Sequence, residues 1–144
     1  IAGAATAVAR AVEQARGAGA KLAKQLPVSV PSHCALMHPA AERLRARLVQ
    51  MKIETPRIPV LHNAHVRAES DADAIRAALV RQVESPVRWV EIIQTMAAYG
   101  VDKLVECGPG RVLAGLNKRI SKQIQTLSVS DPETLRQART ALNI

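Results

Sequence analysis

KLVECGPGRVLAGLNKRISKQIQTLSV, residues 103–129, holds the pattern that decides the fold class. Lys103 to Cys107 has the composition of a short β-strand, and Gly108-Pro109-Gly110 forms a turn directly after it. A helix is expected next, because apolar residues recur at helical spacing from Val112 to Ile120. Gln125 to Val129 is a second short strand. A strand, a helix and another strand in this order predict an α/β fold with parallel crossovers.

Five further helices are expected outside this stretch, from apolar residues at helical spacing and from residues that favour helix ends. Ser70 or Asp71 caps one of them. Ser85 caps the next and places a proline at its first position. Ser130 or Asp131 does the same for the last. The expected helices cover residues 1–16, 39–51, 72–83, 86–99 and 132 onward.

Two more strands complete the expected pattern. Leu26 to Val30 alternates apolar residues with polar residues or proline, and Pro31 ends any ladder there. Ile58 to Asn63 is apolar and rich in β-branched residues. Strands separated by helices then repeat along the chain, which is typical of a parallel sheet.

Composition and charge narrow the possible partners. The 144 residues carry a net charge of +8, are 48% hydrophobic and contain only 1% aromatic residues. The charge favours an acidic partner, but single-stranded nucleic acid is bound largely by aromatic stacking, for which this chain has almost no residues. The apolar runs are too short to span a membrane. Two cysteines without a disulfide pattern indicate a reducing, cytoplasmic setting.

The histidines and serines are the candidates for chemistry. His33 follows an apolar run and Pro31, where open α/β sheets place functional residues. A neutral imidazole there could act as a general base, although a lone histidine among apolar residues is more often structural. His62 and His65 lack a further ligand at metal-binding spacing and are expected to be exposed loop residues. No serine has a glycine within two residues, so a nucleophile elbow is missing.

Four segments of the chain carry a family resemblance: LPVSVPSHCALM (26–37), IPVLHNAHV (58–66), DAIRAALVRQVESPVRW (73–89) and VECGPGRVLAGLNKRI (105–120). In this order they resemble the malonyl-CoA:acyl-carrier-protein transacylases of type II fatty-acid synthesis. The resemblance extends over essentially the whole chain.

The resemblance implies a mechanism and its residues. In that family a serine attacks the malonyl thioester and a histidine takes the serine proton; the phosphopantetheine thiol of the carrier protein then collects the malonyl group. His33 matches the family's catalytic histidine. Gln82 matches the position whose backbone carbonyl orients the imidazole, and Asn63 matches a residue that lines the site. No cofactor or metal is implied.

The resemblance also implies what lies outside these residues. The nucleophilic serine, and the arginine that binds the malonyl carboxylate, belong to a preceding half of the family's fold. Residues 1–27 would end a small ferredoxin-like subdomain, and residues 28–144 would complete a large hydrolase-like α/β subdomain. Without the preceding half we expect no activity. Lys21 and Lys24 lie where the family faces its acidic carrier protein.

Two other interpretations remain open. The chain could be a non-catalytic module that binds an acidic protein or nucleic acid through its basic surface. It could also be an acyltransferase domain of a polyketide synthase.

Overall fold

The computed structural model describes residues 1–144, which form two compact units, Ile1–Arg88 and Trp89–Ile144. This division falls within the larger of the two expected subdomains. The boundary after residue 27, between the two subdomains that the family resemblance implies, stays a prediction. None of the helices has the length and apolar character needed to cross a bilayer.

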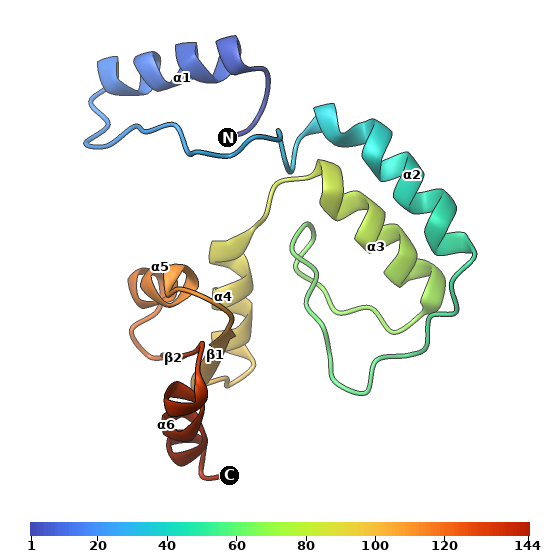
Figure 1. Ribbon diagram of the computed structural model, residues 1–144, viewed down its shortest axis with the longest axis vertical. Helices are drawn as coiled ribbons and strands as arrows, with labels where there is room; N and C mark the ends of the chain where they lie inside the picture. The colour runs from blue at the N-terminus through green and yellow to red at the C-terminus, as the bar shows by residue number, and fades with distance from the viewer. The chain divides into compact units, whose positions relative to one another are not determined.

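The first unit is built around two helices that lie side by side, α2 (His38–Val49) and α3 (Ala72–Glu84) (Figure 1). Ala41 and Leu48 of α2 pack against Val80 of α3, and all three are buried. Positions 41, 44 and 48 lie on one face of a helix, so this apolar stripe meets its counterpart on α3. Partly buried residues enlarge the cluster: Leu44, Ile53, Leu79 and Val83.

The start of α3 confirms Asp71 as its cap. The Asp71 carboxylate accepts hydrogen bonds of 2.9 Å from the backbone N–H groups of Asp73 and Ala74. These are two of the N–H groups that the first turn of a helix cannot satisfy by itself. The helix that the sequence predicts from residue 72 therefore begins at its expected place.

The first helix is shorter than expected. Helix α1 (Ala5–Gly17) begins at Ala5 rather than Ile1, and Ala4 provides no side-chain cap. No residue of α1 is buried. A short 3-10 helix, η1 (Ala35–Met37), precedes α2.

Two predicted strands are wrong. Residues 26–30 form no strand, because Pro27 and Pro31 each lie at the centre of a tight three-residue turn. The N–H of Val28 bonds to the carbonyl of Leu26, and the N–H of Ser32 bonds to that of Val30, both at 2.8 Å. Residues 58–63 contain only one antiparallel bridge, from Leu61 to Ala68.

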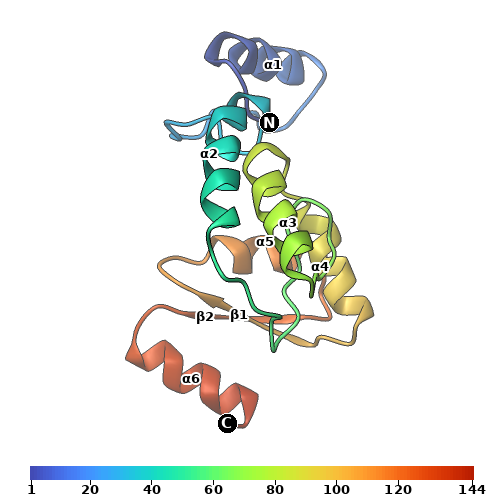
Figure 2. The same cartoon turned by 90° about the vertical axis from the view of Figure 1, so that its right-hand side faces the viewer.

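The second unit confirms the strand–helix–strand prediction. Strands β1 (Lys103–Cys107) and β2 (Gln125–Val129) pair in parallel, with Lys103 opposite Gln125 and Cys107 opposite Val129. Helix α5 (Val112–Ile120) connects them. Figure 2 shows α5 and α6 (Pro132–Leu142) on opposite faces of this two-stranded sheet. The observed structure is thus a mixture of helices with a small parallel sheet.

Helix α4 (Trp89–Ala98) begins three residues later than expected. Ser85 is extended, with φ −117° and ψ 148°, as a residue before proline prefers to be. The N–H of Arg88 then bonds at 2.9 Å to the carbonyl of Asn63. Residues 86–88 are therefore held by a contact to a distant loop and are not in a helix.

A partly buried hydrogen-bond chain joins three elements of the second unit. The indole N–H of Trp89 donates at 2.9 Å to Oδ1 of Asn117, which is only 3% exposed. The Asn117 amide donates in turn to Oγ1 of Thr126, at 3.4 Å. This chain links α4, α5 and β2.

Replacing Trp89 by phenylalanine should lower the free energy of unfolding of this unit by about 1 kcal/mol, because a buried amide oxygen loses its donor. Urea denaturation followed by circular dichroism measures the change. Tyr99→Phe is the matched control, since the Tyr99 side chain is 75% exposed. Equal stability of the two variants would contradict the structural role of the indole hydrogen bond.

Candidate active site

His33 lies at the centre of a small network that joins its loop to the end of α3. Its backbone N–H donates at 3.2 Å to the carbonyl of Val83. Its ring Nδ1 is 2.9 Å from the carbonyl oxygen of Gln82. His33 has a positive φ of 62°, a conformation that few residues other than glycine adopt. The contacts to α3 hold the residue in that conformation.

The carbonyls of Gln82 and Val83 can accept from His33 because they lie in the last turn of α3 and have no partner within the helix. The last four carbonyls of a helix have no partner within the helix. Gln82 would normally accept from the N–H four residues later, but position 86 is a proline and has none. The Ser85-Pro86 sequence thus ends the helix and leaves the Gln82 carbonyl open to the imidazole.

The Gln82 contact determines which ring nitrogen of His33 carries the proton. A carbonyl oxygen only accepts hydrogen bonds, so the nitrogen that faces it must be Nδ1–H. In the neutral ring, Nε2 then has a free lone pair. This is the tautomer in which a histidine can take a proton from a nucleophile.

His33 also lines a hollow of about 260 Å³ together with Leu44, Leu79, Gln82 and Val83. Three of these neighbours are aliphatic, and they come from the two helices of the core. The hollow is therefore mostly apolar, with the imidazole and the Gln82 amide as its polar groups.

Asn63 joins the same network through Gln82. The backbone N–H of Asn63 is 3.4 Å from the side-chain Oε1 of Gln82, a long hydrogen bond. Gln82 therefore contacts His33 with its backbone and Asn63 with its side chain. The structure brings together the three residues that the family resemblance singles out, and their chemical roles remain a prediction.

Lys21 and Lys24 are not part of this network. Both are exposed, in a segment without regular secondary structure. No hydrogen bond or ion pair links either side chain to His33 or to another residue. Cys34 is not a partner of His33 either, because its thiol donates at 3.2 Å to the carbonyl of Pro31.

The prediction of exposed loop histidines is wrong for His62 and His65. His62 is only 6% exposed, and the two rings stack with centroids 5.4 Å apart. Burial first, and then the charge of His65, lower the pKa of His62 from its ordinary value of 6.5, whereas Glu69 raises it. No group of three or more possible ligands is arranged to hold a metal ion.

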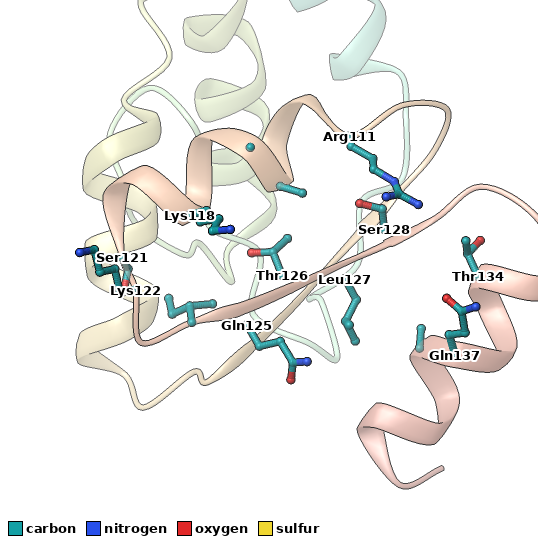
Figure 3. Close-up of a pocket in the computed structure, with 14 residues that line it drawn as sticks. Arg111, Lys118, Ser121, Lys122, Gln125, Thr126, Leu127, Ser128, Thr134 and Gln137 are labelled. Carbon is teal, nitrogen blue, oxygen red and sulfur yellow. The ribbon is translucent and has the colours of Figure 1, made fainter.

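A larger hollow in the second unit was not predicted from the sequence. It has a volume of about 700 Å³ and lies between α5, β2 and α6 (Figure 3). Lys118 and Lys122 line one end, and Thr134 and Gln137 of α6 line the other. Arg111 also lines it, and no carboxylate does. No spacing in the sequence indicated this hollow, because Lys122 lies beyond the end of α5 and the lining residues come from separate elements.

The chain is similar to known proteins in sequence and in structure. No family model matches the chain. The malonyl CoA-acyl carrier protein transacylase of Haemophilus influenzae is 56% identical over 131 residues, which is 91% of this chain and 42% of that protein. The Escherichia coli K12 protein of the same name is 48% identical over 135 residues, or 94% of this chain and 44% of that protein. The chain thus spans less than half the length of the curated relatives it matches.

Solved structures give the same result. A malonyl-transacylase in complex with a type II polyketide-synthase acyl-carrier protein superposes with a TM-score of 0.92 and 47% identity, over 95% of this chain and 44% of that one. The malonyl CoA-acyl carrier protein transacylase of Coxiella burnetii also gives 0.92, with 44% identity, over 97% of this chain and 44% of that one.

Proposed function

Because the chain is homologous in sequence and fold to the C-terminal part of malonyl CoA-acyl carrier protein transacylases, we propose that it carries the general base of the same acyl transfer. The observation that supports this most directly is the 2.9 Å contact between Nδ1 of His33 and the Gln82 carbonyl. That contact leaves Nε2 free to take a proton.

The proposed reaction has two half-reactions. In the first, Nε2 of His33 accepts the proton of a serine hydroxyl as the serine oxygen bonds to the malonyl carbonyl. The carbon–sulfur bond of the thioester breaks, and coenzyme A leaves as a thiol with the proton from Nε2. In the second, the carrier-protein thiol gives its proton to Nε2 and takes the malonyl group, and the serine regains its proton. The nucleophilic serine lies outside these 144 residues in this proposal.

The remaining site residues have supporting roles in the proposal. Asn63 lines the site, where its contact with the Gln82 side chain holds it near the imidazole. Lys21 and Lys24 dock the acidic carrier protein, and the net charge of +8 favours that partner. The two free cysteines fit a cytoplasmic location. Subdomains at 1–27 and 28–144 complete the proposal, as the family resemblance implies.

A second candidate differs only in the acceptor. One structural neighbour is a transacylase bound to a carrier protein of a type II polyketide synthase. The chain could therefore serve a polyketide carrier by the same chemistry. A malonyl-loaded enzyme offered both kinds of carrier protein would decide between them by its relative transfer rates.

Intact-mass spectrometry after incubation with malonyl-CoA tests the proposed function. We expect the 144-residue chain alone to gain no malonyl group. A longer protein that contains these residues after a serine-bearing segment should gain one group and pass it to carrier protein. If the longer protein gains none, the proposed reaction is wrong. The basic hollow of Figure 3 would then point to a binding module for acidic partners.

A further inference from the structure

The loop of residues 61–69, here called the histidine loop, buries two histidines that the proposed reaction does not use. A bridge between Leu61 and Ala68 closes the loop. The N–H of His62 bonds at 3.0 Å to the carbonyl of Arg67, and the N–H of Val66 bonds at 2.9 Å to that of His62. Val66 has a φ of 58°, which is strained for a β-branched residue. The closed loop must therefore be held by contacts that outweigh this strain.

The buried ring nitrogen and the ring stack of the histidine loop disfavour an added proton, whereas the Glu69 carboxylate favours one. Nε2 of His65 is 3.0 Å from Oε1 of Glu69, so the proton of the neutral ring lies on Nε2. Nδ1 of His65 is buried and has no hydrogen-bond partner. A second proton would have to enter at that nitrogen, where no acceptor is available. A proton on His62 would instead place a charge on a residue that is only 6% exposed and whose ring stacks on His65.

The same loop carries Asn63 to the candidate active site. The Asn63 N–H faces Oε1 of Gln82 at 3.4 Å, and its carbonyl accepts from the N–H of Arg88 at 2.9 Å. The loop residue therefore contacts both the end of α3 and the segment that follows it. A change in the loop therefore acts directly on Gln82, whose carbonyl accepts the hydrogen bond from His33.

We propose that the histidine loop is an acid-sensitive latch: it holds Asn63 against Gln82 while His62 is neutral, and it releases Asn63 when His62 takes up a proton. The titratable groups that act on His62 are His65 and Glu69, both on this loop. The group that α3 presents to the loop at Asn63 is the neutral Gln82 amide. The latch goes beyond the proposed function, since it can operate whichever reaction the site performs.

The direction of the pH effect follows from burial. Burial, and then His65, lower the pKa of His62 in the closed loop, whereas an open loop restores a value near 6.5. Above that value both states are neutral and the latch has its full stability. As the pH falls below it, the open loop binds the proton more readily, so the closed form loses stability.

Amide hydrogen exchange of the 144-residue chain, read by NMR between about pH 7.5 and pH 5.5, tests the latch without any acyl substrate. After correction for intrinsic exchange, we expect opening at the Asn63 and Arg88 amides to increase toward the acid end, by at most about tenfold for one proton. The double variant His62→Asn with His65→Gln, which cannot bind the proton, should show no such increase. His38→Gln, an exposed histidine of α2, is the control and should behave as the wild type.

A second variant keeps the test decisive if the double variant does not fold. Glu69→Gln retains an oxygen that can accept from Nε2 of His65 but removes the charge that raises the pKa of His62. Acid opening should therefore become larger than in the wild type. A flat wild-type profile, or an unchanged or smaller response in Glu69→Gln, would overturn the latch. Neither result bears on whether His33 supports acyl transfer.

Discussion

His33→Ala should lower the rate of malonyl transfer about 10³-fold in the protein that also carries the serine. Without Nε2, no positioned group takes the serine proton during attack on the thioester. The second half-reaction loses the same base, so transfer from the acylated serine to the carrier thiol should slow as well. Stopped or quenched single-turnover assays that follow malonyl on the enzyme and on the carrier measure both steps.

His38→Ala is the matched control for this prediction. His38 is also near the C-terminal end of α3, where its Nδ1 is 2.8 Å from Oε2 of Glu84, but its side chain is 64% exposed. Its removal should leave the rate almost unchanged, because an exposed pair of this kind contributes little. Similar losses in the two variants would show that His33 acts through the structure of this region and not as a base.

Pro86→Ala should lower the transfer rate about tenfold, the second largest effect that we expect, because it weakens one orienting hydrogen bond. Alanine restores an N–H at position 86 and removes the restriction that keeps Ser85 extended. Helix α3 can then continue for a further turn. The new N–H of residue 86 competes with His33 for the Gln82 carbonyl. The imidazole would lose part of its fixed tautomer and orientation.

Pro59→Ala separates this effect from the general loss of a proline. Pro59 is exposed, in a connector without regular structure. Its replacement should leave the rate almost unchanged. Hydrogen exchange in Pro86→Ala should also show new protection at residue 86. A normal rate in Pro86→Ala despite that protection would contradict the role given to the Gln82 carbonyl.

Local signals explain which elements could be predicted. Asp71 and Asp131 each accept hydrogen bonds from the first turn of the helix that follows, and both helices begin where expected. The strands at 103–107 and 125–129 are also as predicted, because the helix between them brings the two together. The segments at 26–30 and 58–63 have strand-like residues but no partner strand. Composition alone cannot provide the partner that a strand requires.

The candidate site depended on a different kind of information. The family resemblance placed His33, Gln82 and Asn63 in one site, and the structure places them in one network. Residue spacing alone could not do so, because 49 positions separate His33 from Gln82. The burial of His62 was missed for the same reason: long-range packing decides whether a loop histidine is exposed.

The most direct measurement is the protonation pattern of the His33 ring, from ¹⁵N NMR correlations of the 144-residue chain above neutral pH. The account predicts a proton on Nδ1, donated to the Gln82 carbonyl, and an unprotonated Nε2. Pro86→Ala should shift the ring toward a mixture of tautomers. A proton on Nε2 in the wild type would contradict the account, because the nitrogen meant to act as the base would then have no lone pair to offer.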